Sequence, residues 1–251
     1  MRTLLIPPLA SAGRTDEIVQ RISEAIQLGL LSDGEQLPAE VEFANQLGVS
    51  PMTLREGLAV LRQQGLVETR RGRHGGTFVR RPADPPRAPL LERIAAATVS
   101  ELRDLADEQL AVSGASAKLA AERASRANLR RLLTLVEQLS RAEGMGARVR
   151  ADSRFHIEVA IASQSERLTR LEVALQSQTA GPLWLSYDSE AEIDEVVAEH
   201  HAIATAIAEE DGDRARSLAE RHVQRNLRRL IELHLRTVEE RGEVLTDDVR
   251  A

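Results

Sequence analysis

Residues 37–80 read LPAEVEFANQLGVSPMTLREGLAVLRQQGLVETRRGRHGGTFVR, and this stretch decides the fold of the first part of the chain. Apolar residues recur at approximately helical spacing over residues 39–47 and again over residues 51–64, which predicts two short helices. Gly48 is expected to end the first helix, and Ser50 is a suitable N-cap for the second. The stretch therefore predicts a helix-turn-helix.

A basic hairpin follows the second helix. Beyond Gly65 the apolar spacing changes to two, which predicts a strand over residues 66–71 and a return strand over residues 77–79. The tip between them, residues 72–76, reads GRHGG. Glycine allows a tip to turn with positive φ and to approach a sugar-phosphate backbone closely, and arginine displaces the counterions of DNA. The helix pair and the hairpin together predict a winged helix-turn-helix that binds double-stranded DNA.

The net charge of −6 does not favour DNA binding, but the local distribution of charge does. Residues 1–81 hold 10 arginines and 9 acids, whereas residues 82–251 hold 23 basic and 30 acidic residues. Within residues 55–81, seven arginines accompany only two acids. Positive potential is therefore concentrated at the second helix and the wing.

The order of these parts resembles the GntR family of bacterial transcription factors. The resemblance covers residues 14–80 and includes a leading helix over residues 14–30, followed by LPAE, SPMTLREGL, GLV and GGTFV. The family often has arginine where this chain has Val41 and Pro51, so its base preference should differ from that of better known members. The resemblance implies that six residues contact the operator: Ser50, Thr53, Arg55, Arg71, Gly72 and Arg73.

The chain has no cysteine, which excludes disulfides and thiolate metal sites and is compatible with a reducing compartment. Residues 1–13, MRTLLIPPLASAG, hold an apolar run that two prolines interrupt and that is too short to span a bilayer. We therefore expect a cytoplasmic protein without a membrane segment.

Residues 81–89, RPADPPRAP, are expected to form a stiff, extended connector. We accordingly expect a DNA-binding domain over residues 1–81, a linker over 82–89 and an all-helical domain over 90–243. Aromatic content is only 2%, so an antiparallel α-helical bundle must build its core from aliphatic residues. Its expected helices cover residues 90–97, 99–123, 128–141, 147–163, 168–178, 193–209 and 214–240, with an Asp-Gly-Asp turn at residues 211–213 joining the last two.

Four residues of this bundle are candidate metal ligands. Asp152 and His156 stand four apart, so their side chains lie on one helix face. His200 and His222 lie about equally far from the turn between the last two helices and can approach each other across that antiparallel pair. One carboxylate and three imidazoles suit zinc, or alternatively nickel or manganese, with a coordination position left open. Ordinary core or surface histidines are the alternative interpretation, and His201 is the alternative to His200.

The bundle is also similar to the FCD ligand-binding domain of the FadR branch of the GntR family. DSRFH and EHHAIATAIAEEDGDRARSLAERHV carry the resemblance, which covers roughly residues 90–240 and implies a metal site on the same four residues. It further implies an effector such as a small organic acid or an acyl thioester. Gln109 replaces an arginine that is frequent in such domains, and Ser165 replaces an asparagine. Arg103 and Arg154 are candidate cations for the effector, together with Gln109 as a candidate contact.

The leading hypothesis is a ligand-responsive transcriptional regulator, a repressor that binds a palindromic operator as a homodimer and performs no catalysis. One alternative is a metal-dependent hydrolase fused to a DNA-binding head, in which Glu158 or Glu199 would serve as general base. Another is a DNA-binding dimer whose helical domain binds no effector.

Overall fold

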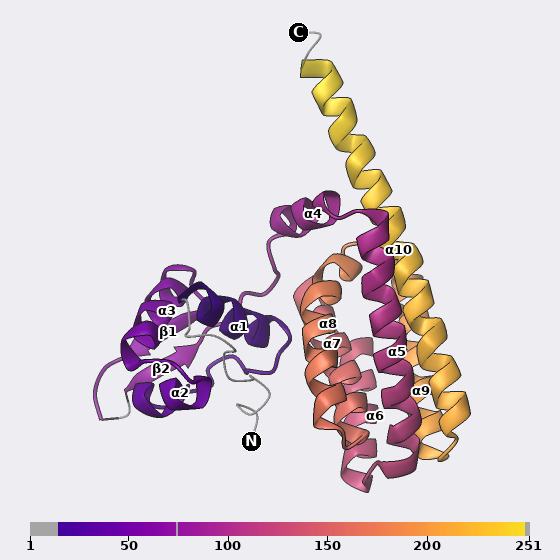
Figure 1. The fold of residues 1–251 in the computed structure, drawn as a ribbon, viewed down its shortest axis with the longest axis horizontal. Helices are drawn as coiled ribbons and strands as arrows, with labels where there is room; N and C mark the ends of the chain where they lie inside the picture. Colours follow the sequence, from indigo (N-terminus) through magenta and orange to yellow (C-terminus); the bar gives the residue numbers. More distant parts are fainter. Residues whose placement is uncertain (1–14, 74, 249–251) are drawn as a thin grey trace. The chain divides into compact units, whose positions relative to one another are not determined.

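The computed structural model describes residues 15–73 and 75–248. They form two compact units that divide between Asp84 and Pro85, and each is described by itself (Figure 1). The prediction of a mainly α fold, a winged helix-turn-helix followed by a helical bundle, is confirmed.

The first unit contains the helix-turn-helix and the wing. Its helices and strands are short, and local residues determine where the second helix ends and the third begins. Gly48 closes its second helix in the left-handed conformation at φ 71°, and the Ser50 hydroxyl caps the third helix by accepting from the Thr53 N–H at 3.1 Å. The two strands pair antiparallel, with Val67 opposite Val79. The elements are α1 (Thr15–Gln27), α2 (Glu40–Leu47), α3 (Pro51–Gln63), β1 (Val67–Arg70) and β2 (Gly76–Val79).

A small, mainly aliphatic core that includes the buried Phe43 holds this unit together, and α1 and α3 are in close contact within it. Gly57 of α3 is buried, and a Cβ placed there would lie 2.9 Å from Cγ2 of Ile18 on α1. A larger residue at position 57 would therefore force the two helices apart. The expected leading helix proved shorter: α1 ends at Gln27 rather than residue 30, and residue 14 lies outside the described part of the chain.

Packed helices make up the whole of the second unit, as far as the structure describes it, and Figure 1 shows α5 and α10 side by side along the bundle. Buried alanine, leucine, valine and isoleucine fill most of its interior, in agreement with the low aromatic content. The helices are α4 (Arg87–Ala96), α5 (Val99–Arg123), α6 (Arg126–Ser140), α7 (Met145–Ala162), α8 (Glu166–Trp184), α9 (Glu190–Ala208) and α10 (Gly212–Asp248).

Helix α8 differs most from the sequence-based expectation. The expected helix ends at residue 178, yet α8 continues through Gly181 and Pro182 to Trp184. Proline cannot donate to the carbonyl four residues earlier, that of Gln178. Arg93 of α4 supplies the missing donor, because its Nη2 lies 2.7 Å from that carbonyl oxygen. Tertiary packing by α4 thus sustains a helix through a glycine-proline pair.

Several other helix boundaries also differ from the expected ones. Helix α4 begins at Arg87 and takes up the last residues of the expected connector, since Pro89 lies in a first turn that needs no backbone donor. Gly212 belongs to α10 rather than to a turn, and the reversal is made just before it, where Glu210 has φ 59°. Helix α10 runs to Asp248, well beyond the expected residue 240. Among the described helices, none is both long and apolar enough to cross a membrane.

Candidate functional site

The start of α3 brings together two of the residues expected to contact DNA. Ser50 and Thr53 lie on the first turn, with their hydroxyl oxygens 2.7 Å apart. Met52, which the sequence analysis did not select, has a side chain that is 69% exposed next to them. This helix end therefore offers two hydroxyls and one apolar group to a groove.

Arg55 lies one turn further along α3, and its side chain forms an ion pair. Its Nε and Nη2 both contact Oε2 of Glu40, the first residue of α2, at 3.1 and 2.8 Å. Because both side chains are largely exposed, at 69% for Arg55 and 41% for Glu40, the pair adds little to stability. It does hold the guanidinium in one orientation while leaving Nη1 outside the pair.

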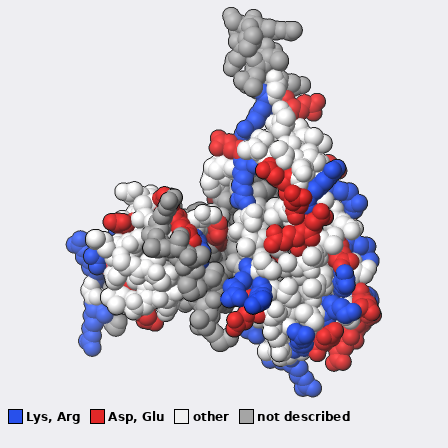
Figure 2. Space-filling model, viewed as in Figure 1, with Lys and Arg blue, Asp and Glu red and all other residues white. Residues whose placement is uncertain are grey.

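The wing carries the other expected contacts. Arg71, Gly72 and Arg73 are all exposed on the segment between β1 and β2, and His74 lies outside the described residues. Gln36 stabilises the tip, because its Nε2 donates to the Gly75 carbonyl at 3.1 Å. In Figure 2, basic side chains gather at the edge of this unit where the wing lies in Figure 1.

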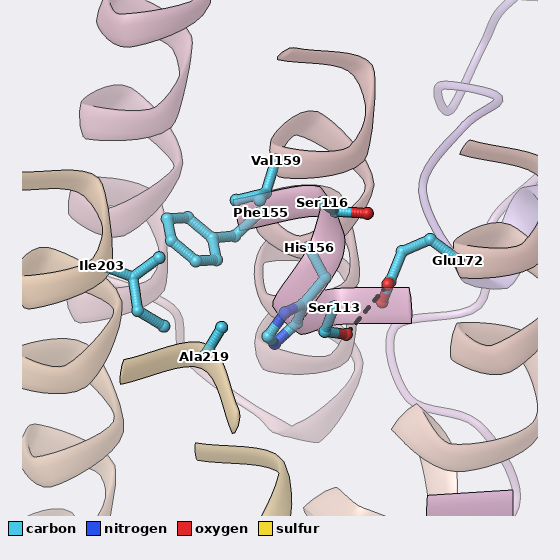
Figure 3. Close-up of a pocket in the computed structure, with 8 residues that line it drawn as sticks. All are labelled: Ser113, Ser116, Phe155, His156, Val159, Glu172, Ile203 and Ala219. Carbon is cyan, nitrogen blue, oxygen red and sulfur yellow. Dashed lines mark hydrogen bonds between the residues drawn. The ribbon is translucent and has the colours of Figure 1, made fainter. Parts of the chain in front are cut away.

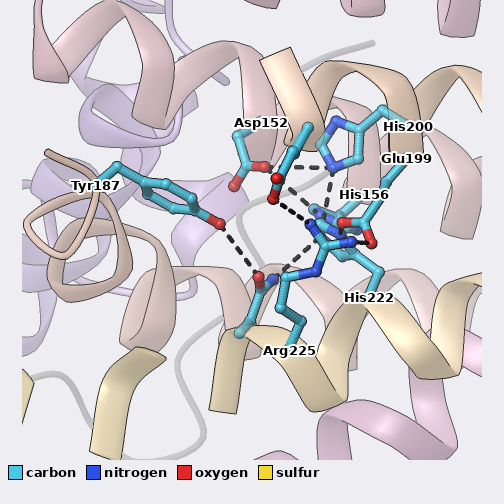
Figure 4. A network of polar contacts seen from close by, with 9 residues as sticks. Asp152, His156, Tyr187, Glu199, His200, His222 and Arg225 are labelled. Carbon is cyan, nitrogen blue, oxygen red and sulfur yellow. Dashed lines mark hydrogen bonds and ion pairs between the residues drawn. The ribbon is translucent and has the colours of Figure 1, made fainter. Parts of the chain in front are cut away.

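In the helical bundle, the four candidate metal ligands converge from three helices (Figure 4). Asp152 and His156 come from α7, His200 from α9 and His222 from α10, and all four are buried. One ligand atom from each lies within 4.8 Å of the others. His201 points elsewhere: it is exposed and contacts Thr205, so the structure brings His200 into the cluster instead.

The distances and the chemistry of this cluster fit a bound divalent metal. Nε2 of His200 lies 3.5 Å from Oδ1 of Asp152 and 3.4 Å from Nε2 of His222. Two ligand atoms about 2.0–2.1 Å from a tetrahedral zinc ion lie about 3.3–3.4 Å apart, which is close to these values. Moreover, Oδ1 of Asp152 is buried without a hydrogen-bond partner, an unfavourable condition that a cation would relieve.

Residues around the cluster orient His222. Its Nδ1 donates to Oε2 of Glu199 at 2.8 Å, which leaves the lone pair of Nε2 facing the other ligands. Glu199 in turn pairs with Arg225. The Nδ1 contact with Glu199 is the kind of second-sphere hydrogen bond that is usual for metal-binding histidines. Asn226 donates to Nε2 of His222 at 3.0 Å, a contact that a metal bound by Nε2 would replace, and accepts a long hydrogen bond from the Tyr187 hydroxyl.

Burial also favours the neutral imidazoles that metals require. It lowers the pKa of His200 well below its usual value and that of His222 to about 3. Burial acts in the same direction on His156, but the hydrogen bond and negative charge of Asp152, with the charge of Glu172, raise the pKa of His156 above its usual value. His156 is therefore the ligand at which a proton competes with a metal.

A small cavity lies beside His156 (Figure 3). The empty space around it amounts to about 230 Å³, a volume that includes solvent at the open side, and its enclosed part is much smaller. Arg103, Gln109 and Arg154 are not among its lining residues. The cavity is lined by Ser113 and Ser116 of α5, Phe155, His156 and Val159 of α7, Glu172 of α8, Ile203 of α9 and Ala219 of α10.

Sequence reasoning missed Glu172, which is only 1% exposed. Its position contains a signal that could have found it, because Glu172 falls on the same helical face as Leu168 and Leu175, where an apolar residue is expected. The two carboxylates considered as general bases have other partners: Glu158 contacts Asn128 and Arg131, and Glu199 contacts His222 and Arg225.

These observations define a class of protein: a winged-helix DNA-binding unit joined to a helical bundle with a buried cluster that could hold a metal. Comparison with known proteins agrees. Residues 14–79 match the bacterial regulatory proteins of the gntR family, and residues 104–225 match the FCD domain. The chain belongs to the GntR family of transcriptional regulators and carries an FCD effector-binding domain.

Individual relatives point the same way. The HTH-type transcriptional regulator RmpR of Mycobacterium gastri is 43% identical over 88% of this chain and 82% of its own length. The galactonate operon transcriptional repressor of Escherichia coli (strain K12) is 28% identical over 88% of this chain and 98% of its own. The solved structure of E. coli McbR/YncC superposes with a TM-score of 0.52 at 19% identity, covering 88% of this chain and 99% of that chain, and supports the fold.

Proposed function

We propose that this regulator is a repressor that binds a two-fold symmetric operator as a homodimer and is released by a small organic acid bound beside a divalent metal. The observation that carries the proposal is the buried Asp152, His156, His200 and His222 cluster, with its unpartnered carboxylate oxygen, in the same chain as a winged helix. The relatives include one named as an operon repressor and another named as an operon activator, and repression is the direction that we propose.

The chain's own residues suggest how operator and effector are bound. Ser50, Thr53 and Arg55 are exposed or half-buried at the start of α3 and can reach base edges, while Arg71 and Arg73 of the wing suit phosphate contacts. One such head covers a short half-site, so a homodimer with a palindromic site is the expected arrangement.

In the bundle, Asp152 and the three histidines would hold the metal, with zinc the ion that best suits this donor set. A bound divalent ion would supply positive charge and a coordination position for an anionic oxygen. Glu199 and Arg225 hold His222 in the required tautomer, and Phe155 stacks on His200 at 4.2 Å between ring centroids. These contacts fix the ligands before an effector arrives.

Release of the operator follows from linkage. An effector that favours one arrangement of the bundle must disfavour DNA binding by the same coupling free energy, typically about 1–3 kcal/mol, or roughly 5- to 150-fold in affinity. Trp184 is buried in the bundle near Tyr187, with ring centroids 4.8 Å apart, and its fluorescence is a suitable reporter of binding.

The test uses the full chain and DNA obtained by in vitro selection. Selected sites should contain inverted repeats, and the metal-loaded protein should bind them as a dimer. Small organic acids and acyl thioesters are then screened by Trp184 fluorescence and by gel shift. We expect one group of acids to weaken operator binding, and a strong chelator to abolish this effect. A ligand that binds tightly without changing operator affinity, or that is consumed with turnover, would contradict the proposal.

A further inference from the structure

Glu172 on α8 is a buried acid whose charge the fold does not balance. Ser113 Oγ donates to its Oε2 at 3.0 Å, and Gln176 Nε2 donates to its Oε1 at 2.9 Å. Each carboxyl oxygen thus accepts one hydrogen bond from a neutral group. Among the described residues, no lysine or arginine lies within ion-pair distance of Glu172. A buried carboxylate without a cation is strongly unfavourable.

Glu158 is a buried carboxylate of the same bundle that has a cationic partner. It is 6% exposed, accepts from Asn128 Nδ2 at 2.9 Å and lies 3.1 Å from Nε of Arg131. Glu158 therefore has a structural role that needs no ligand. A cation that paired with Glu172 would therefore come from outside the chain.

The position of Glu172 indicates where that cation would bind. Glu172 lines the small cavity together with His156, whose Nε2 belongs to the metal cluster, and with Ser116 (Figure 3). The Ser116 hydroxyl is buried and has no hydrogen-bond partner. One cavity thus contains a metal-ligand imidazole, a carboxylate and a free hydroxyl, and its other walls are apolar, including Phe155 and Val159.

Formal charges then distinguish between classes of effector. A divalent ion held by Asp152 and three neutral imidazoles keeps one positive charge. Glu172 places one negative charge on the same cavity. A plain carboxylic acid is attracted by the metal centre but repelled by Glu172, whereas a zwitterion satisfies both charges at once.

We propose that Glu172 determines effector specificity and that the effector is a small amino acid, with its carboxylate toward the metal centre and its ammonium group held by Glu172 and the Ser116 hydroxyl. This inference rests on the proposed function and specifies the chemical class of the effector. The enclosed part of the cavity has room for little more than one water molecule, so the effector requires the cavity to open, and only a short side chain can be accommodated.

Matched sets of ligands provide the test on metal-loaded, full-length protein. Each set holds an amino acid, the 2-hydroxy acid and the unsubstituted acid of equal carbon number: glycine with glycolate and acetate, and alanine with lactate and propionate. Affinities are measured by calorimetry and by Trp184 fluorescence. In the wild type, the amino acid should bind about tenfold or more tightly than the unsubstituted acid, as expected for a charge-assisted hydrogen bond.

Substitutions then assign this preference to one residue. Glu172→Gln should remove it by weakening amino-acid binding about tenfold, without weakening binding of the unsubstituted acid. Glu158→Gln removes a buried carboxylate outside the cavity lining and should keep the preference. Glu172→Asp retains the charge and should keep the preference in reduced form, which provides a test if the Gln variant folds poorly. Metal content is measured in every variant.

Two results would overturn the inference while leaving the proposed function intact: a wild type that binds unsubstituted or hydroxy acids at least as tightly as amino acids, or a Glu172→Gln variant that keeps the amino-acid preference. If no member of either set binds the metal-loaded wild type, this inference fails. If organic acids and acyl thioesters at large also leave operator binding unchanged, the proposed function fails with it.

Discussion

Glu40 should orient Arg55 for base contact, and replacing it with glutamine tests this directly. Oε2 of Glu40 accepts from both Nε and Nη2 of Arg55, so the pair links the first residue of α2 to the exposed face of α3. Glutamine keeps the shape of the side chain and removes its charge. The predicted consequence is a loss of sequence discrimination with little change in stability.

The magnitudes follow from exposure. An ion pair between groups that are 69% and 41% exposed contributes about 0.2–1 kcal/mol to the free energy of unfolding, so Glu40→Gln should fold normally. Releasing Arg55 restores rotamer freedom that DNA binding must remove again, at a cost of about 0.5–1.5 kcal/mol. Specific operator affinity should therefore fall about 2- to 13-fold. Non-specific affinity should rise slightly, because one negative charge is lost near the phosphates.

Fluorescence anisotropy with the operator and with a scrambled duplex, at several salt concentrations, measures both effects. Glu42→Gln is the matched control, since it removes an acid of the same helix whose side chain accepts a hydrogen bond from Gln46 and not from Arg55. Arg55→Ala alone should cost about 1–3 kcal/mol if the guanidinium contacts a base. In the double variant Glu40→Gln/Arg55→Ala, the effect of Glu40→Gln on specific binding should disappear.

Additive effects in this double-mutant cycle would refute the reasoning, because Glu40 would then act independently of Arg55. So would a gain in operator affinity on Glu40→Gln, which would mean that Glu40 competes with DNA for the guanidinium.

Three further predictions concern other parts of the molecule. His200→Ala should lose the bound metal in elemental analysis, whereas His201→Ala should keep it; equal metal content in both variants would contradict the assignment of ligands. Arg73→Ala on the exposed wing should weaken binding to all duplexes and flatten the salt dependence by about one unit of slope, and an unchanged slope would exclude a phosphate contact. Gly57→Val should destabilise the first unit by about 1–3 kcal/mol, because the added atoms overlap Ile18; an unchanged melting temperature would show that α1 can move aside.

Much of the first unit could be predicted from sequence because its boundaries are set locally. Gly48 and Ser50 act through their own backbone and side chain, so the break between α2 and α3 is readable without tertiary information. The proximity of the four candidate metal ligands could also be predicted from the sequence. Two of them are four residues apart on α7, and the other two lie at similar distances from the reversal between α9 and α10.

The remaining features depend on contacts between distant segments. The pair Gly181 and Pro182 is typical of a loop, and only the packing of α4 shows why it lies inside a helix. Glu172 likewise has a sequence position that predicts burial, but its partner Ser113 is on another helix and the cavity between them cannot be read from spacing. Gln109 is a candidate because it stands where the resembled domains frequently have arginine, yet the cavity is lined by residues one and two turns further along α5.

The hydrogen bond from Arg93 to the Gln178 carbonyl couples the position of α8 to that of α4. Helix α8 carries Glu172 less than two turns before that carbonyl, and α4 is the first element of the bundle after the connector from the winged unit. If α8 rotates or slides, either α4 moves with it or the carbonyl that Pro182 cannot engage loses its donor. A shift at one wall of the cavity would therefore reach the chain segment that leads back to the DNA-binding head through the Arg93 guanidinium and the apolar contacts between α4 and α8.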